Sequence, residues 1–293
     1  MIIVSIGGGL GNQMFEYAFY EMLKQKYPQV QVKLDIMHTW GHAHNGYELE
    51  RIFGCKGEDC TTKELLKLSD FYPKDGKLYK LGELFFKVRR KVLGERKSCI
   101  KQEDFTEFDD KFYHLNPEQS YYLWGVFSNC HYWSGQEQHI RQVFTFPEIT
   151  EEHNKVWMEK IKQTNSVSMH IRHGDYVSWG IKILGEDYYR TAMNLLEEKV
   201  GDCQFYVFTD DPEYVRNTYG DKKNLVVVEG NSGANSYRDM QLMSCCKHNI
   251  VANSTFSFWG AFLNDNPDKI VIASKEPYTG CKEPFACDDW MLI

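Results

Sequence analysis

The chain has 293 residues, and 42% of them are hydrophobic, so it can bury two cores of ordinary domain size. Its formal net charge of −7 excludes a surface built to neutralise a nucleic acid, and we expect no nucleic-acid partner. The nine cysteines lack the paired short spacings of a zinc site and the density of a disulfide-stapled domain, which favours a reducing compartment.

The N-terminus predicts a strand, a glycine turn and a helix. Residues 1–8 form a run of branched apolar residues that ends in glycines, and apolar residues recur at helical spacing over 11–27. A second strand is expected over 31–36, whereas few elements can be placed between 61 and 119. The first apolar run is too short to span a bilayer and follows no basic segment, so we expect a cytoplasmic protein without a targeting or transmembrane segment. Peripheral association with the inner face of the membrane is left open.

Strands and helices alternate regularly in the second half of the chain. The expected strands cover 166–173, 203–210, 224–230, 249–253 and 269–274, and the expected helices cover 185–200, 211–220, 236–248 and 254–265. This alternation predicts a parallel, doubly wound sheet, which binds ligands at the carboxyl ends of its strands. A proline and a charged stretch near residue 150 predict two Rossmann-like domains, 1–155 with an irregular insert and 156–293.

The stretch "HIRHGDYV" (170–177) raises three possibilities: a metal site, a nucleophilic histidine or a phosphate grip. Alternation along a strand puts His170 and Arg172 on one face and His173 on the other, so the two histidines do not easily chelate one ion. A phosphohistidine motif needs a second histidine followed by an acid downstream, and none occurs after His173. The remaining interpretation is a phosphate site, in which Arg172 clamps the anion.

The stretch "NSTFSFWGA" (253–261) supports the phosphate interpretation. It leads from an apolar strand into a helix that begins at Ser254, Thr255, Phe256 and Ser257. Unpaired backbone N–H groups, hydroxyls and the helix dipole converge at such a helix start and favour an anion, although an ordinary helix cap is the simpler alternative. Because this strand and the strand before Arg172 open at the same edge of the sheet, we expect the two stretches to share one site.

Two acids belong to the same edge. Asp210 ends a predicted strand, and Asp239 lies in the helix before the strand 249–253. A carboxylate facing a nucleotide pocket can accept paired hydrogen bonds from the N1–H and the exocyclic amine of guanine. The structural alternatives are a helix N-cap for Asp210 or Asp211 and a solvated helix face for Asp239.

The N-terminal glycine cluster is a near match to the dinucleotide-binding fingerprint. Gly7 and Gly9 are correctly spaced, but Asn12 replaces the third glycine, which argues against NAD. A tight glycine turn still lets the backbone approach a ligand, and the amides of Asn12 and Gln13 suit sugar hydroxyls or a phosphate.

Four stretches together resemble a known family. "GGLGNQMFEYAF", "HIRHGDYV", "FTDD" and "NSTFSFWGA" occur in the order and approximate spacing of the bacterial-type α-1,2-fucosyltransferases of glycosyltransferase family 11. The resemblance implies a GT-B-like α/β fold of two facing Rossmann-like domains, with GDP-L-fucose in the C-terminal domain and a galactose-terminated glycan held largely by the N-terminal one. It implies inverting transfer of L-fucose to the 2-hydroxyl of the galactose, with no metal ion and no cofactor.

The same resemblance implies roles for individual residues. Arg172 would bind the donor diphosphate and His170 would line the nucleotide pocket, while Asp239 matches a guanine-binding acid. Asn12 matches an asparagine at the reacting centre. Further donor-side candidates are Asp210, Ser254, Thr255, Phe256 and Ser257, and further acceptor-side candidates are Gly9, Gly11, Gln13, His38 and His42.

Three points stay open in the sequence. The family commonly has a second arginine where this chain has His173, and the general base is not predicted. His38 and His42 follow the second strand and are candidates for that base, with a solvent-exposed loop as the alternative. The alternative functions are transfer of a different nucleotide-linked sugar and glycan binding without catalysis.

Overall fold

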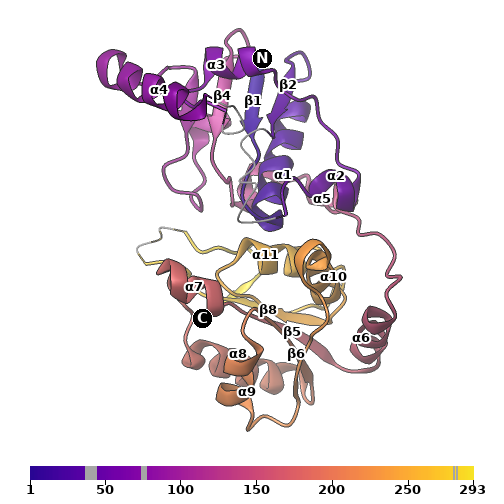
Figure 1. Cartoon of the computed structure of the whole chain (residues 1–293). Coiled ribbons are helices and arrows are strands. Elements are labelled where there is room, and N and C mark those ends of the chain that lie inside the picture. The colour runs from indigo at the N-terminus through magenta and orange to yellow at the C-terminus, as the bar shows by residue number, and fades with distance from the viewer. Residues whose placement is uncertain (37–44, 74–77, 280, 282) are drawn as a thin grey trace. The chain divides into compact units, whose positions relative to one another are not determined.

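A computed structural model of the chain describes residues 1–36, 45–73, 78–279, 281 and 283–293. The chain divides into two compact units, Met1–Thr145 and Phe146–Ile293, and each unit contains one parallel sheet flanked by helices (Figure 1). The charged stretch near residue 150 forms a helix of the second unit, α6 (Glu152–Gln163), and the sequence-based boundary at 155/156 falls inside that helix.

The first unit has a four-stranded parallel sheet in the order β2–β1–β4–β3. Its strands are β1 (Ile2–Ser5), β2 (Val32–Asp35), β3 (Cys99–Lys101) and β4 (Tyr121–Trp124). Its helices are α1 (Leu10–Lys26), α2 (Leu49–Phe53), α3 (Thr62–Leu68), α4 (Tyr79–Leu93) and α5 (Glu137–Val143), with 3₁₀ turns at Asp110–Phe112 and Cys130–Trp133. Strand, glycine turn, helix and second strand follow one another at the N-terminus, as the sequence predicts.

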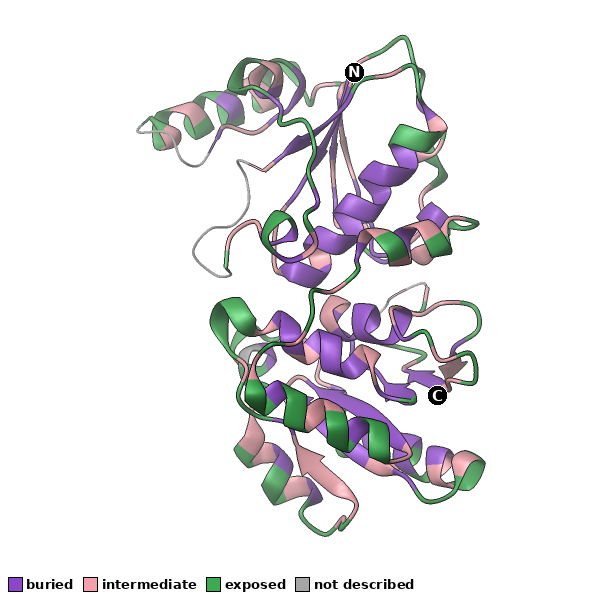
Figure 2. Ribbon diagram, turned by 90° about the vertical axis from the view of Figure 1, so that its right-hand side faces the viewer, coloured by how far each residue is buried: buried purple, intermediate pink, exposed green. Residues whose placement is uncertain are grey.

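Helix α1 lies in the core of the first unit. From Leu10 to Leu23 every residue except Asn12 is buried, and Figure 2 shows the buried colour along most of the helix. Phe19 stacks on Phe127 with ring centroids 4.0 Å apart. A helix that is buried on all sides brings its few polar side chains into the core as well, and each of them then needs a hydrogen-bond partner.

The second unit has a six-stranded parallel sheet in the order β7–β6–β5–β8–β9–β10. Its strands are β5 (Ser166–Ile171), β6 (Gln204–Thr209), β7 (Leu225–Val227), β8 (His248–Ile250), β9 (Val271–Ala273) and β10 (Met291–Leu292). Its other helices are α7 (Gly174–Trp179), α8 (Glu186–Val200), α9 (Pro212–Tyr219), α10 (Tyr237–Ser244) and α11 (Thr255–Phe262), with a 3₁₀ turn at Gly233–Asn235. Counted along the chain this is the strand order 3-2-1-4-5-6 of the dinucleotide-binding folds, which confirms the predicted doubly wound sheet.

The central strand β5 is buried along its whole length. Val167, Met169 and Ile171 pack into an apolar cluster with residues of α8 and α9. Because side chains alternate along a strand, Ser168 and His170 point to the opposite side of the sheet, where α6 and α10 supply a second apolar cluster. His170 is therefore a buried polar side chain in the layer between the sheet and the helices α6 and α10. A polar side chain in such a position indicates a role in function.

Candidate active site

The second sheet has a topological switch point between β5 and β8, where successive strands begin to be added on the other side of the sheet. These two strands are hydrogen-bonded neighbours, yet the chain runs from β5 to β6 on one side and from β8 to β9 on the other. In open α/β sheets, ligands bind at such a switch point, outside the carboxyl ends of the strands. The residues at this switch point are Arg172 and His173, which follow β5, and Asn253 and Ser254, which lie between β8 and α11.

Two contacts tie these segments together. The Tyr176 hydroxyl on α7 donates to the Asn253 carbonyl at 2.9 Å, and the His170 ring lies 5.8 Å from the Phe256 ring, measured between centroids. The Asn253 side-chain amide donates to the Lys182 carbonyl at 2.8 Å. The structure thus brings together the two stretches that the sequence assigned to one site.

Arg172 is held at this edge by an acid and an aromatic ring. Its Nε lies 3.7 Å from Oδ2 of Asp210, and its guanidinium carbon lies 5.2 Å from the centroid of the Tyr176 ring. The side chain keeps 24% of its exposure, so a ligand outside the strand ends can reach it. An arginine that neighbours hold in place loses little conformational freedom when it binds an anion.

Asp210 and Asp211 organise the chain beside Arg172. Oδ1 of Asp210 accepts a hydrogen bond from the backbone N–H of His173 at 3.0 Å, so Asp210 positions this loop. Asp211 caps α9 by accepting from the Tyr214 N–H at 3.0 Å, as the structural alternative had it. That N–H and the neighbouring His173 lower the pKa of Asp211.

His173 does not follow the alternation expected from the sequence, because β5 ends at Ile171. Its Nδ1 lies 2.9 Å from Oδ2 of Asp211, and its ring stacks on Tyr214 with centroids 3.9 Å apart and planes 6° apart. His173 therefore links the segment after β5 to α9.

His170 is a neutral imidazole at neutral pH. Burial, reinforced by the nearby Arg172 charge, lowers the pKa of His170 to about 3. Within the described part of the chain, Nδ1 of His170 is a buried nitrogen with no hydrogen-bond partner. Buried polar atoms are rarely left unsatisfied, so this nitrogen fits a hydrogen bond to a bound ligand.

The N-terminus of α11 completes this edge. Ser254 is the N-cap, with φ of −140° and ψ of 130°, and its hydroxyl accepts from the Phe256 N–H at 3.3 Å. Thr255 and Phe256 are half-buried at the start of the helix. The Ser257 hydroxyl instead accepts from the Ala252 N–H at 3.1 Å and lies 3.2 Å from the Ser254 carbonyl. Ser257 therefore shapes the turn before α11, and its role toward the donor stays a prediction.

Asp239 lies in the first turn of α10, which packs against α11. Its Oδ1 accepts from the Asn231 side-chain amide at 2.8 Å. Burial raises the pKa of Asp239 to about 7, although the Asn231 amide and the nearby His153 act in the opposite direction. The structural alternative for Asp239 was a solvent-exposed helix face. Its hydrogen bond to Asn231 and its raised pKa do not fit that alternative.

The glycine turn of the first unit is built around two buried polar side chains of α1. Oε2 of Glu16 accepts from the Gly7 N–H at 2.7 Å, and burial raises the pKa of Glu16 well above its ordinary value. The Gln13 side chain donates to the Gly8 carbonyl at 3.0 Å and to the Gly46 carbonyl at 2.7 Å, and its oxygen accepts from the Glu48 N–H at 2.9 Å.

These contacts change the roles expected for the first unit. The Gln13 amide uses both of its donor hydrogens inside the protein and so shapes the turn, and its role toward an acceptor sugar stays a prediction. Gly9 is the N-cap of α1 and Gly11 is buried, whereas Asn12 stays partly exposed. His38 and His42 lie outside the described residues.

If Asn12 lies at the reacting centre, as the family resemblance implies, replacing Gly8 by alanine should displace it and slow the reaction. Gly8 has a φ of +69°, and an added Cβ would lie 2.7 Å from Nδ2 of Asn12. Gly54 has a φ of +68° with nothing within 4 Å of an added Cβ, so Gly54→Ala carries the same backbone strain of about 1 kcal/mol without the collision. Steady-state kinetics should show a fall of about tenfold or more for Gly8→Ala only. Equal losses in both variants would mean that strain alone, and not the position of Asn12, matters.

The fold and the residues at the switch point define a class of protein, the α/β enzymes that hold a nucleotide-linked substrate on a Rossmann-type sheet. Comparison with known proteins narrows this class, because the sequence profile described as glycosyl transferase family 11 matches residues 68–290. The chain belongs to glycosyl transferase family 11, and its two Rossmann-like units are those of a GT-B-like fold.

Individual relatives agree with the family. The chain is 31% identical to the O-antigen biosynthesis glycosyltransferase WbnK of Escherichia coli, over 98% of this chain and 99% of that protein. It is 30% identical to an alpha-1,2-colitosyltransferase of Escherichia coli, over 93% of this chain and 91% of that one. Among solved structures, the fucosyltransferase NodZ from Bradyrhizobium matches 88% of this chain and 91% of its own, with 14% identity and a TM-score of 0.49.

Proposed function

We propose that this glycosyltransferase moves L-fucose from GDP-L-fucose to the 2-hydroxyl of a terminal galactose in a glycan, with inversion at the anomeric carbon. The observation that carries the proposal is that the segment containing Arg172 and the N-terminus of α11 meet at the switch point of the second sheet, through the Tyr176–Asn253 hydrogen bond and the His170–Phe256 ring contact. Relatives named galactoside alpha-(1,2)-fucosyltransferases support the transferred sugar and the linkage, and one from Saimiri boliviensis boliviensis is 26% identical over 43% of this chain.

The negative charge that develops on the diphosphate during transfer determines what the residues at the strand ends must do. The acceptor oxygen forms a bond to C1 of fucose on the face opposite GDP, and its proton is lost to water. The bond from C1 to the diphosphate oxygen breaks, and the electron pair stays on GDP. The Arg172 guanidinium and the first N–H groups of α11 stabilise that negative charge, since donors already in place need no reorganisation. In this proposal no metal ion or cofactor takes part.

The other polar residues fix the substrates. Neutral His170 offers its buried Nδ1 to the donor, and the ionised carboxyl of Asp239 accepts hydrogen bonds from guanine. Asn12 on the first unit orients the attacking hydroxyl, because a side-chain amide is too weak a base to remove its proton.

Donor binding should depend on the protonation of Asp239. With a pKa of about 7, the carboxyl is largely protonated below that pH and cannot accept both hydrogen bonds of guanine. We expect KM for GDP-L-fucose to fall as the pH rises through about 7 in the wild type, and to be flat over that range in Asp239→Asn. A wild-type KM without this pH dependence would remove Asp239 from the guanine site.

The ligand-free protein should show the opposite trend in stability. The folded pKa of Asp239 is raised, so the protonated form is the one that stabilises the fold. The contribution is complete below the unfolded pKa of about 3.9 and is lost as the pH rises toward about 7. Urea unfolding without ligand should therefore give a shallower pH dependence in Asp239→Asn than in the wild type.

The decisive test of the proposed function is a donor and acceptor panel with linkage analysis. GDP-L-fucose, other nucleotide sugars and galactose-terminated oligosaccharides are incubated with the protein in EDTA, and products are identified by mass spectrometry and NMR. The proposal expects a fucosyl-α-1,2-galactose product. The colitosyltransferase relative at 30% identity favours a second candidate, transfer of colitose from its nucleotide-linked form, and turnover with that donor alone would replace the first.

A further inference from the structure

Helix α4 of the first unit exposes an unusual number of large apolar side chains. Of the eleven exposed large hydrophobic residues in the described part of the chain, seven lie between positions 78 and 93, and Figure 2 shows the helix largely exposed. They are Leu78, Leu81, Leu84, Phe85, Val88, Val92 and Leu93, with exposed fractions from 53% to 73%. Isolated exposed apolar residues are ordinary, but a contiguous group marks a binding surface.

The exposed residues form one stripe. Positions 78, 81, 85, 88 and 92 follow one another at steps of three and four, which places them along a single face of a helix. A different face holds α4 to the domain: Phe86 is the one buried residue of the helix, and a Cβ on Gly82 would lie 2.4 Å from the Tyr72 ring. The stripe is thus separate from the face that docks α4. We name these five positions the α4 stripe.

A row of lysines runs beside the α4 stripe. Lys80, Lys87 and Lys91 are exposed, and their spacing of seven and four residues aligns them on one side of the helix. Between positions 78 and 97 the chain has seven lysines and arginines against two glutamates, although the whole chain has a net charge of −7. Positive charge is therefore concentrated around an apolar face in an otherwise acidic protein.

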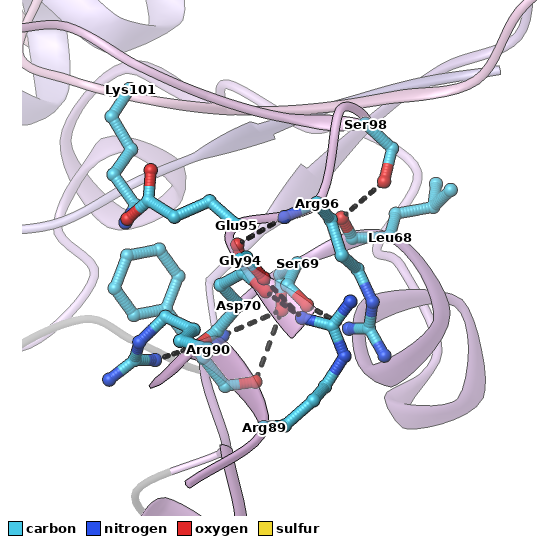
Figure 3. A network of polar contacts seen from close by, with 11 residues as sticks. Leu68, Ser69, Asp70, Arg89, Arg90, Gly94, Glu95, Arg96, Ser98 and Lys101 are labelled. Carbon is cyan, nitrogen blue, oxygen red and sulfur yellow. Dashed lines mark hydrogen bonds and ion pairs between the residues drawn. The ribbon is translucent and has the colours of Figure 1, made fainter. Parts of the chain in front are cut away.

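A buried acid anchors the far end of α4 (Figure 3). Asp70 is fully buried and accepts from Arg89 Nη1 at 2.9 Å and from the Arg96 backbone N–H at 2.8 Å, while Arg90 donates to the Asp70 carbonyl. These arginines hold the helix to the domain, so the stripe is presented on a fixed element. The three lysines do not appear among these contacts, and they flank the stripe instead.

We infer that the α4 stripe and its lysine row bind the surface of an anionic lipid bilayer. An amphipathic helix with large apolar residues on one face and lysines beside it lies in the interface plane, with the apolar residues among the acyl chains and the ammonium groups at the head groups. Anionic lipid attracts each such lysine. A second copy of this chain would bring the same positive charge to the contact, which opposes that occupant. Among the described residues, no helix has the length and apolar character needed to span a bilayer.

Flotation with vesicles tests this inference and does not depend on the proposed function. The full chain should float with vesicles of phosphatidylcholine and phosphatidylglycerol, and more weakly with phosphatidylcholine alone. Leu81→Ser/Phe85→Ser/Val88→Ser and Lys80→Gln/Lys87→Gln/Lys91→Gln should each lower partitioning by about tenfold or more. Added salt should weaken binding of the wild type.

Matched variants control for composition and folding. Val156 is 50% exposed in the second unit, so Val156→Ser removes an apolar side chain elsewhere. Lys160, Lys199 and Lys223 are exposed in the same unit, and their triple change to glutamine removes the same charge. Both controls should float like the wild type, and all variants should keep the wild-type circular dichroism spectrum. The inference is overturned if the wild type does not bind anionic vesicles, if the controls lose binding equally, or if light scattering shows a dimer that only the α4 variants dissociate.

Discussion

Replacing Arg172 by alanine is expected to lower kcat by about 10²- to 10³-fold, because removal of one preorganised donor to a developing charge typically costs about 3 to 4 kcal/mol of transition-state stabilisation. The loss should fall mainly on kcat, since the negative charge on the diphosphate grows as the bond to fucose breaks. Initial rates with saturating GDP-L-fucose and a galactose-terminated oligosaccharide measure it directly.

Two further variants sharpen this prediction. Arg172→Lys keeps the charge but loses the planar fork of donors, so its kcat should lie between those of the wild type and the alanine variant. Arg216 is 53% exposed in an ion pair with Glu229 on the surface of the same unit, and Arg216→Ala should leave kcat unchanged. A near-normal kcat for Arg172→Ala would exclude the residue from the donor site.

Replacing Asp70 by alanine is expected to destabilise the first unit by about 3 kcal/mol, because it leaves Arg89 and the Arg96 N–H without the buried carboxylate that accepts from both. The segment 89–98 should lose its attachment to the domain first. Hydrogen exchange of amides in that segment reports the local change, and urea unfolding reports the change for the unit.

The matched variant for Asp70→Ala is Glu95→Ala in the same network (Figure 3). Glu95 pairs with Lys101, but its side chain is 61% exposed, and exposed ion pairs contribute only about 0 to 1 kcal/mol. Exchange rates should therefore change little in Glu95→Ala. If the two variants were equally stable, burial of the Asp70 carboxylate would not be what holds α4.

The second unit could be predicted from sequence because strands and helices alternate regularly along it. Strand β5 alternates polar and apolar residues, strand β6 is mostly apolar, and helices α9 and α11 begin at the capping residues Asp211 and Ser254. In the first unit, β3 and β4 follow a long stretch in which strands and helices do not alternate regularly, and β4 pairs with β1, which lies far from it in the sequence. No local pattern marks these two strands, which is why the sequence did not predict them.

The residues of the candidate site could be predicted from sequence where a charged or polar residue stands at an unusual position, such as the end of an apolar strand. Arg172 at a strand end and the helix start at Ser254 stand out in this way, and the structure brings their segments together. Gln13 and Ser257 look like ligand-binding residues, but only the folded loops reveal that backbone groups occupy their side chains. Glu16 was not singled out from the sequence, although an acid among the apolar residues of a core helix is itself a signal.

The central claim is that the donor nucleotide binds at the switch point of the second sheet. The most direct test is to measure which backbone amides GDP protects from hydrogen exchange. If GDP binds at the switch point of the second sheet, the amides of residues 172–176 and 254–258 should exchange more slowly when it is added, and Arg172→Ala should weaken that protection. Protection confined to the glycine turn at residues 7–13, with none after β5 or at the start of α11, would contradict the account.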